Sequence, residues 1–318
     1  MEFKYGIIST AEINHRFIGA INATKGKVVA IASRNIDKAK KIALQYHIEK
    51  AYGSYEELYQ DTEVNLVYIS TINKEHVNQI KKALHYGKHV LCEKPIALHK
   101  KDAIEVFSLA KEKNLFLMEM QKSLFLPVTT IIKEYINSKK LGNLHQVDMS
   151  ACFYRPLAKW MYDPKQGGVV YGSASYTIEY LDYLIEPKEI IVLPLATKDD
   201  TNCIDSVALN IKMDDVLINS RITMKAKAKS FCHFYFDNGY IEVDEYWKAR
   251  SIRITVCPLG IDEEDIKQIN LPIDFEMVYE IKHVEECLEN NKIESSIMDS
   301  KRSILCCEVV DTIINFIG

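Results

Sequence analysis

His89-Val90-Leu91-Cys92 is an apolar strand that leads directly into Glu93-Lys94-Pro95, and a helical pattern begins soon afterwards at Lys101. In an open α/β sheet, ligands bind outside the carboxyl ends of the strands, so a lysine at this point is placed for chemistry. The proline ring restricts the backbone beside it. The stretch therefore predicts a strand of a parallel sheet that carries Lys94 to a ligand site, with a surface lysine in a proline-containing loop as the simpler alternative.

The segments around this strand alternate between strand and helix patterns. Strands are expected at 5–9, 28–32, 64–70 and 115–120, and helices at 13–21, 36–46, 74–86 and 101–113. Ser54 and Glu57 have the spacing of a capping box, which opens a further helix. Strands regularly separated by helices are typical of parallel βαβ units with right-handed crossovers. The sequence therefore predicts an N-terminal Rossmann domain, a doubly wound parallel sheet, over residues 1–121.

The pattern changes after Met120, and we expect a second domain over residues 122–318. Alternating segments at 146–154, 206–213, 217–225, 230–236, 240–244 and 250–257 follow one another largely without helices, and Asp237-Asn238-Gly239 has the composition of a hairpin turn. Helices are expected at 129–138, 273–289 and 299–317, the last two packing on one or both domains. The predicted fold class is α/β, with a C-terminal α+β domain built on a large, mainly antiparallel open sheet.

Composition limits the kinds of partner. Hydrophobic residues make up 47% of the 318-residue chain and charged residues 26%, as in soluble globular proteins, and the formal net charge of −4 shows no basic bias. Nucleic acid is therefore not expected as a partner. The start of the chain lacks the architecture of a signal peptide, and no apolar run approaches the ~18 residues of a membrane span. We expect a cytoplasmic protein without a membrane partner.

The eight cysteines, at 92, 152, 203, 232, 257, 287, 306 and 307, form no Cys-x-x-Cys pair and no Cys/His metal spacing. No metal site is expected, and reduced thiols in the core are the simplest interpretation. Cys92 is left open as an exception because it adjoins the proposed site.

The turn after the first strand, Gly6-Ile7-Ile8-Ser9-Thr10-Ala11-Glu12-Ile13, is the candidate phosphate-binding turn. A dinucleotide fingerprint has glycines where Ser9 and Ala11 stand here. Small residues preserve close approach of a phosphate, but a position that needs a positive φ would be strained. Glu12 is expected in the first helical turn, where its charge repels a phosphate. Residues 9–13 are nevertheless the predicted contacts of the cofactor pyrophosphate.

Glu93-Lys94-Pro95, following this nucleotide segment, resembles the signature of the Gfo/Idh/MocA oxidoreductases, which include glucose-fructose oxidoreductase and inositol dehydrogenase. The serine in the phosphate turn resembles dihydrodiol dehydrogenase-like members. The resemblance implies that Lys94 lies beside a nicotinamide ring, where its amine polarises a substrate oxygen or moves its proton, and that Glu93 orients it. It also implies a cis Lys94–Pro95 peptide.

The second strand ends in Ser33-Arg34 and carries no acidic residue there. A carboxylate at this point binds the ribose 2′-hydroxyl of NAD, whereas a hydroxyl and an arginine suit a 2′-phosphate. NADP(H) is therefore the preferred cofactor, with NAD(H) possible. The alternative is that Ser33 and Arg34 only solvate a loop before the helix capped near Asn35.

Ser70-Thr71-Ile72-Asn73-Lys74-Glu75-His76 resembles the Thr-Pro-Asn-x-x-His segment of the same family, with Ile72 in place of proline. The resemblance implies that Thr71, Asn73 and His76 line the cofactor. Asn73 is equally suited to be a helix N-cap, and a structural role is favoured for His76.

In the second half, Gly167-Gly168-Val169-Val170-Tyr171-Gly172-Ser173-Ala174-Ser175-Tyr176 resembles the family's Gly-Gly-x-Leu-x-Asp-x-Gly-x-His/Tyr helix, with Gly172 in place of the aspartate. Positions 172 and 176 share one helical face. Tyr176 beside a lysine ammonium can act as acid or base, so Lys94 and Tyr176 are the candidate catalytic residues. With 18 tyrosines in the chain, a core role for Tyr176 is the alternative. Arg155 and Trp160 are candidates for the substrate wall.

These features together predict an NAD(P)-dependent oxidoreductase that acts on a hydroxyl or carbonyl of a sugar, cyclitol or diol-like small molecule. Gly172, with Leu124 and Leu126 where many members carry polar residues, favours a substrate less polar than a free hexose. A catalytically impaired nucleotide-binding sensor or subunit of the same fold is the alternative. The resemblance further implies a homodimer or homotetramer formed through the C-terminal sheet, and apolar strand faces without a covering helix agree with that.

Overall fold

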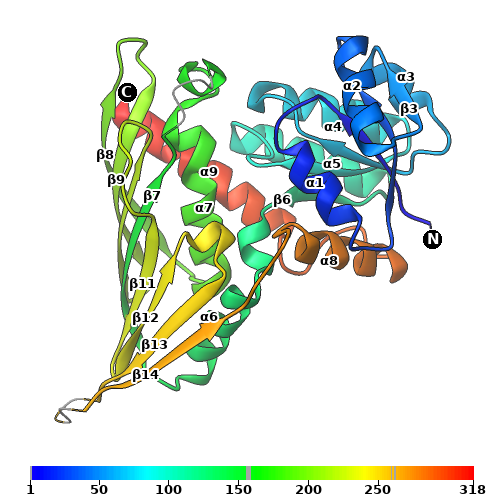
Figure 1. Ribbon diagram of the computed structural model, residues 1–318. Helices are drawn as coiled ribbons and strands as arrows, with labels where there is room; N and C mark the ends of the chain where they lie inside the picture. The colour runs from blue at the N-terminus through cyan, green and yellow to red at the C-terminus, as the bar shows by residue number, and fades with distance from the viewer. Residues whose placement is uncertain (1, 155–158, 259, 261–262) are drawn as a thin grey trace. The chain divides into compact units, whose positions relative to one another are not determined.

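The computed structural model describes residues 2–154, 159–258, 260 and 263–318 (Figure 1). It divides into two compact units. The N-terminal unit contains Met1–Gln121 and Phe275–Cys307, and the C-terminal unit contains Lys122–Asp274 and Glu308–Gly318. The chain therefore returns to the first unit late in the sequence. The assignment of cofactor binding to one part and substrate binding to the other stays a prediction.

The N-terminal unit is built on a six-stranded sheet in the order β3-β2-β1-β4-β5-β6, and every pair of neighbouring strands is parallel. This order reverses between β1 and β4, which is where ligands bind in doubly wound sheets. The strands are β1 (Lys4–Ile8), β2 (Lys27–Ala32), β3 (Lys50–Tyr52), β4 (Leu66–Ile69), β5 (His89–Glu93) and β6 (Leu117–Met120). The predicted Rossmann sheet is confirmed.

Helices separate these strands, and two of them begin with the side-chain caps that the sequence predicts. The Asn35 side chain accepts hydrogen bonds from the backbone N–H groups of Asp37 and Lys38, and Ser54 and Glu57 form the expected capping box. The helices of this unit are α1 (Asn14–Ile21), α2 (Ile36–Tyr46), α3 (Tyr55–Gln60), the short 3₁₀ helix η1 (Asn73–Glu75), α4 (His76–His85), α5 (Lys100–Glu112) and α8 (Val278–Glu289).

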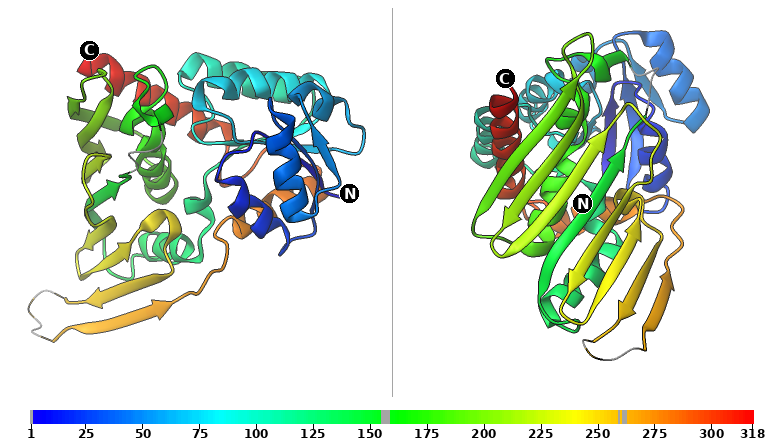
Figure 2. Two further views of the ribbon diagram at one scale, coloured as in Figure 1. Left: turned by 45° about the horizontal axis from the view of Figure 1, so that its top comes forward. Right: turned by 90° about the vertical axis from the view of Figure 1, so that its left-hand side faces the viewer.

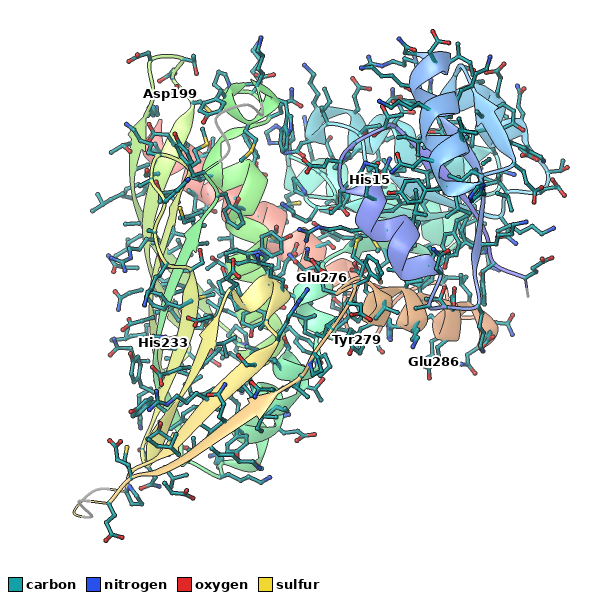
Figure 3. All side chains as sticks on the ribbon, in the orientation of Figure 1. His15, Asp199, His233, Glu276, Tyr279 and Glu286 are labelled. Atoms are coloured by element: carbon teal, nitrogen blue, oxygen red, sulfur yellow. The ribbon has the colours of Figure 1, made fainter. Side chains whose placement is uncertain are left out.

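Polar contacts attach α8 to β1, and Glu276, two residues before α8, to α1. The Tyr5 hydroxyl donates to Glu285 Oε1 at 3.3 Å, and Glu276, labelled in Figure 3, pairs with Arg16 of α1. Glu285 is 3% exposed, so its carboxylate is stabilised by the Tyr5 hydroxyl and by the Lys25 N–H, which donates to Oε2 at 3.1 Å, rather than by water. The two members of each pair are more than 250 residues apart in the sequence, so no local pattern could predict these contacts.

The C-terminal unit is built on an eight-stranded sheet in the order β14-β13-β12-β11-β7-β10-β9-β8. Among the described strands, β7 and β10 are paired in parallel and the other neighbours are antiparallel. The strands are β7 (Leu144–Cys152), β8 (Ile190–Lys198), β9 (Ile204–Met213), β10 (Val216–Thr223), β11 (Phe231–Phe236), β12 (Gly239–Asp244), β13 (Ser251–Val256) and β14 (Asp265–Asn270). The predicted large, mainly antiparallel sheet is confirmed, including the hairpin at Asp237-Asn238.

One face of this sheet is covered by α7, which packs against β9 and β10 (Figure 1). In the right-hand view of Figure 2 the opposite face is turned toward the viewer. Leu193, Leu195 and Leu217 are 56%, 72% and 59% exposed there. Other elements of this unit are η2 (Lys122–Phe125), α6 (Pro127–Ser138), η3 (Lys159–Tyr162), α7 (Gly168–Ile185) and η4 (Tyr246–Lys248); α9 (Ser300–Ile317) begins in the N-terminal unit and ends in this one.

Among the described helices, none combines the length and the hydropathy needed to span a bilayer. Likewise, the described His, Cys, Asp and Glu side chains nowhere gather in a group of three or more suited to a metal ion.

Candidate active site

The turn after β1 keeps a glycine-like backbone although serine stands in it. Ser9 has φ +88°, a conformation that usually requires glycine. Its hydroxyl donates to the Ser70 carbonyl at 2.8 Å and accepts from the Ala11 N–H at 3.1 Å, and its own N–H donates to the Ala32 carbonyl at 2.9 Å. These bonds hold a conformation that would otherwise cost about 1–3 kcal/mol. The turn thus retains the shape that close approach of a phosphate needs.

A buried asparagine, Asn14, also holds this turn in place through hydrogen bonds. The Asn14 side chain donates to the Ser9 carbonyl at 3.0 Å and accepts from the Ser70 hydroxyl at 2.6 Å, and it is 0% exposed. Asn14 was not predicted as a site residue. The available signal was a polar residue on the apolar face that Phe17 and Ile21 define, at the first position of the helix.

The remaining residues of the turn lie close to the surface. Thr10, Ala11 and Ile13 are partly exposed, and Glu12 is exposed. The expectation that Glu12 lies in the first helical turn is wrong, because α1 begins at Asn14 and contains no acidic residue in its first turn. Its carboxylate is therefore not fixed by the helix, and water screens it.

At the end of β2, Ser33 and Arg34 differ in environment. Ser33 is 7% exposed, and its hydroxyl accepts a 3.3 Å hydrogen bond from the Asn35 N–H. This bond agrees with the alternative in which Ser33 serves only the loop before α2. Arg34 is exposed, and its guanidinium interacts with the Tyr55 hydroxyl at the start of α3. Burial raises the pKa of Tyr55, and Arg34 opposes that rise. Arg34 thus offers its charge at the surface beside the end of β2.

The ends of β4 and β5 are joined through His76. Its Nδ1 lies 2.7 Å from the Pro95 carbonyl oxygen, and its Nε2 lies 3.0 Å from the Thr71 carbonyl oxygen. His76 is 1% exposed, and burial lowers its pKa. Asn73 is buried at the first position of η1, whose N-cap residue is Ile72 without a side-chain capping bond.

Lys94 follows β5 directly and is half-buried, and the Lys94–Pro95 peptide is cis. The next N–H, that of Ile96, donates to Glu119 Oε1 of β6 at 3.0 Å. Glu119 is 1% exposed. The backbone after Lys94 is therefore held by side chains from α4 and β6.

Glu93, the last residue of β5, accepts a 2.6 Å hydrogen bond from the Tyr68 hydroxyl. Tyr68 is fully buried, and its ring stacks on Phe17 with centroids 3.8 Å apart. Burial and the nearby Glu93 charge hold the pKa of Tyr68 well above its ordinary value, so Tyr68 remains a donor. Tyr68 thereby fixes the carboxylate next to Lys94.

Cys92 has no environment that activates a thiol. It is 0% exposed, and burial raises its pKa well above the ordinary value, with Glu119 and Glu93 adding to the rise. A thiolate is the reactive form of cysteine. The possibility left open for Cys92 is therefore not supported by its surroundings.

In the C-terminal unit, Tyr176 belongs to an aromatic cluster with Phe153 and Trp247. Its ring centroid lies 5.9 Å from that of each partner, and the two partners are 4.8 Å apart. Tyr176 is partly exposed. Neither Phe153 nor Trp247 was predicted, because residues from β7's end and η4 meet α7 only in the folded unit.

Gly172 lies one turn before Tyr176 on α7. Gly172 is buried, yet a Cβ atom built on it would meet no described heavy atom within 4 Å apart from its chain neighbours and its own helix backbone, so there is room for a small side chain. Trp160, in η3, is 39% exposed. Leu124 and Leu126 are buried at 1% and 0% exposure, which makes them core residues and weakens their use as evidence for a less polar substrate. Arg155 lies outside the described residues.

The structure thus brings together Ser9, Thr71, His76, Glu93 and Lys94 at the carboxyl ends of β1, β4 and β5. Tyr176 and Gly172 share α7 in the other unit. The pairing of Lys94 with Tyr176 stays a prediction.

Comparison with known proteins agrees with these features. Residues 3–121 match the sequence profile described as "Oxidoreductase family, NAD-binding Rossmann fold" of the GFO_IDH_MocA group, and residues 130–242 match the "GFO/IDH/MocA C-terminal domain". The trans-1,2-dihydrobenzene-1,2-diol dehydrogenase of Xenopus tropicalis is 28% identical over 334 residues, covering 100% of this chain and 99% of that protein. The Mus musculus enzyme of the same name is 25% identical, covering 100% and 98%.

Two solved structures share the fold. KijD10, a 3-ketoreductase from Actinomadura kijaniata in complex with NADP and TDP-benzene, has a TM-score of 0.89 at 20% identity, covering 100% of this chain and 98% of that one. Levoglucosan dehydrogenase in complex with NADH and L-sorbose has a TM-score of 0.89 at 16% identity, covering 99% and 97%.

Proposed function

The chain belongs to the Gfo/Idh/MocA family of oxidoreductases, and on that premise we propose that it transfers a hydride between NADP(H) or NAD(H) and a hydroxyl- or carbonyl-bearing carbon of a sugar, cyclitol or diol-like small molecule. The observation that carries the proposal is the position of Lys94. Lys94 directly follows β5 of a six-stranded Rossmann sheet. The neighbouring Glu93 carboxylate accepts a hydrogen bond from Tyr68, and the Pro95–Ile96 peptide group that follows is held by His76 and Glu119.

The residues at the sheet edge fit a dinucleotide. Ser9 keeps the positive φ that leaves the turn open to a pyrophosphate, and Thr10, Ala11, Glu12 and Ile13 complete the turn. The Thr71 hydroxyl oxygen is buried and has no hydrogen-bond partner among the described residues, which leaves it available to a cofactor polar group.

The end of β2 favours NADP(H) over NAD(H). Arg34 is exposed and positively charged, and neither Ser33 nor Arg34 supplies the carboxylate that would bind a ribose 2′-hydroxyl. A guanidinium binds phosphate through paired, charge-assisted hydrogen bonds. The next acidic residue along the chain, Asp37, is part of α2, two residues after the N-cap Asn35, and so does not stand at the end of β2.

A bound nicotinamide cofactor would supply or accept the hydride, and the chain's own groups manage the proton. The Lys94 ammonium donates a hydrogen bond to the substrate oxygen and stabilises negative charge on it. Its amine form takes the proton when a hydroxyl is oxidised, and its ammonium form returns the proton when a carbonyl is reduced. Glu93 balances the charge, and Tyr176 is the second acid or base.

The substrate wall favours a ring compound with an apolar side. Tyr176 and Phe153 stack on each other and are partly exposed, the buried Trp247 is tilted against both, and Gly172 leaves room where a relative would place a carboxylate. Flat apolar rings bind such surfaces by burying area and by stacking. The similarity to dehydrogenases named for trans-1,2-dihydrobenzene-1,2-diol supports cyclic diols as first candidates, with Arg155 and Trp160 as further wall residues.

We also propose a homodimer or homotetramer that forms through the uncovered face of the C-terminal sheet, and a cytoplasmic location. The exposed leucines of β8 and β10 support the first proposal. All eight cysteines, each within the described residues, are free thiols, which supports a reducing compartment.

The test is a cofactor titration followed by a substrate screen. Purified protein is titrated with NADPH and NADH, and cyclic diols, cyclitols and sugars are then screened with the cofactor that binds. Lys94→Met is expected to lower kcat at least about 100-fold and Tyr176→Phe about 10-fold, since proton transfer contributes roughly 10²–10⁴-fold. Lys111→Met, on the exposed side of α5, is the control for loss of one lysine charge.

Two outcomes separate the candidate functions. Cofactor binding without turnover across the whole screen favours the sensor or subunit that the changes at Ser9, Ala11 and Gly172 also allow. Turnover that survives Lys94→Met contradicts the catalytic assignment.

A further inference from the structure

We propose that His76 and Glu119 are positioning residues that hold the Pro95–Ile96 peptide group from both ends and thereby fix the Lys94 amine for proton transfer. The inference rests on the proposed function, because it assumes that Lys94 moves the proton. It assigns to His76 a role other than contact with the cofactor, and it adds Glu119, which sequence patterns did not single out as a site residue.

The geometry of the contact is specific to one peptide group. The Pro95 carbonyl oxygen lies 2.7 Å from His76 Nδ1, and the Ile96 N–H donates to Glu119 Oε1 at 3.0 Å. This C=O and this N–H belong to the same planar unit, so neither end can rotate without breaking the bond at the other. The proline ring also fixes φ at Pro95. The backbone that carries Lys94 is therefore fixed from its carboxyl side.

Burial indicates that these polar side chains are retained for more than packing. His76 and Glu119 are each 1% exposed. A buried imidazole or carboxylate costs free energy unless it is hydrogen-bonded, and apolar side chains of similar size would fill the same volume at lower cost. The two residues come from different elements, α4 and β6, and both bond to this peptide group.

His76 also connects Lys94 to the cofactor side of the sheet. Its second ring nitrogen lies 3.0 Å from the carbonyl oxygen of Thr71, whose buried hydroxyl follows β4. A neutral imidazole has one N–H, and the shorter contact to the Pro95 oxygen is the better place for it. The charges facing the ring are Glu93 and Lys94, which act on the pKa of His76 in opposite directions.

Amide side chains can separate the two contacts of the ring. The amide nitrogen of asparagine lies near the position of Nδ1, and that of glutamine near the position of Nε2. His76→Asn therefore keeps a donor for the Pro95 oxygen, whereas His76→Gln keeps only the contact toward Thr71. In the same way, Glu119→Gln keeps an acceptor for the Ile96 N–H, and Glu119→Met removes it.

The matched pairs give the kinetic test. We expect His76→Gln and Glu119→Met to lower kcat by about 10–100-fold, since a displacement of about 1 Å can cost 10²-fold in rate. The Kd for NADPH and the substrate KM should stay within about 3-fold, and the pH profile of kcat should shift. His76→Asn and Glu119→Gln should recover kcat to within about 3-fold of the parent.

A readout without turnover accompanies the kinetics. Lysines are labelled by reductive ¹³C-methylation, and the Lys94 resonance is assigned by its loss in Lys94→Met. His76→Gln and Glu119→Met should move this resonance and change its titration midpoint, while His76→Asn and Glu119→Gln leave both near the parent values. Urea unfolding of all four variants measures the purely structural cost.

Two results would overturn the inference. The first is equal kcat and an equal Lys94 resonance for the two variants at position 76 and for the two at position 119. The second is a loss of NADPH affinity in proportion to kcat, because it would make His76 a cofactor ligand. These results differ from a failure of the proposed function. If the Lys94→Met variant retains the parent kcat, the catalytic assignment fails. If Lys94→Met loses activity while all four variants at positions 76 and 119 keep the parent kcat and the parent Lys94 resonance, only the positioning role fails.

Discussion

The hydroxyl of Ser9 donates a 2.8 Å hydrogen bond to the carbonyl oxygen of Ser70 and so joins the carboxyl ends of β1 and β4. Glycine would adopt the same positive φ without strain but would offer no side chain for this bond. Serine carries the strain, about 1–3 kcal/mol, and offsets it with hydrogen bonds of about 1 kcal/mol each. The turn after β1 is therefore stabilised by side chains at a position where a dinucleotide fingerprint has glycine.

The first prediction compares two ways of removing the Ser9 hydroxyl. Ser9→Ala keeps the strained φ and leaves the Ala11 N–H without its acceptor, so the free energy of unfolding should fall by about 2–3 kcal/mol. Ser9→Gly also loses the hydroxyl but relieves the strain, and it should be about 1 kcal/mol more stable than Ser9→Ala. Urea unfolding measures both. An alanine variant as stable as the parent contradicts the account.

The second prediction concerns the cofactor. Arg34→Ala should weaken NADPH binding by about 10–100-fold, because a charge-assisted hydrogen bond contributes about 1.5–3 kcal/mol, and should leave NADH binding within about 3-fold. Fluorescence titration with each cofactor gives the ratio. Lys40→Ala, an exposed change of equal charge on α2, is the control. Tighter binding of NADH than of NADPH by the parent protein would reject the preference itself.

The third prediction tests the uncovered sheet face. Leu193 and Leu195 of β8 are exposed on the face that also carries Leu217 and His233, the latter labelled in Figure 3. Burying a leucine contributes about 1.5–3 kcal/mol, so Leu193→Glu with Leu195→Glu should raise the dissociation constant of the oligomer at least about 100-fold. Sedimentation equilibrium measures it. Leu44→Glu, at an 80% exposed leucine of α2, should leave the oligomer intact.

The strands that sequence patterns missed share a physical cause. β3 is an edge of the first sheet, and β8 and β14 are the two edges of the second. An edge strand has one neighbouring strand, so it can be short or carry polar residues and proline that weaken its pattern. The other edge of the first sheet, β6, is buried throughout and was predicted. Every residue of β14 is at least partly exposed, and β8 contains Pro194, which an edge tolerates. Central strands such as β4, buried throughout, were predicted from their apolar runs.

The site divides in a similar way. The places of Lys94, Ser9 and Thr71 at the sheet edge could be predicted because Lys94 and Ser9 directly follow a strand and Thr71 follows β4 after one residue; strand ends are where ligands bind, so they remain candidate site residues. Asn14, Tyr68 and Glu119 could not, because their roles depend on partners across the sheet. Tyr68 and Glu119 lie inside apolar strands, where a local pattern indicates only burial.

The fourth prediction concerns pH. Burial lowers the pKa values of His76, His89 and His283. His89 Nδ1 also accepts the Phe116 N–H at 3.0 Å, which requires the neutral ring. The unfolded chain therefore binds more protons, and the free energy of unfolding should fall as pH drops below about 7, through the unfolded histidine value of about 6.5.

Urea unfolding at pH 7.5, 6.5 and 5.5 measures this slope. His89→Asn keeps an acceptor for the Phe116 N–H but cannot titrate, so its slope should be shallower. The aspartates with lowered pKa values titrate at more acidic pH and leave this window to the histidines. A stability independent of pH between 7.5 and 5.5 would contradict the prediction.

The last prediction returns to α7. Gly172→Asp places a carboxylate where the family resemblance expects one, and a Cβ there meets no described heavy atom within 4 Å, so the fold should accept it. Hydrogen bonds from substrate hydroxyls to this carboxylate should raise kcat/KM for cyclitols and sugars by about 10-fold or more relative to apolar cyclic diols. Gly172→Ala separates the charge from the added volume. It should stabilise the helix by about 0.5–1 kcal/mol and leave the substrate ratio within about 3-fold. If alanine changes the ratio as much as aspartate does, space and not charge at position 172 determines which ring the protein accepts.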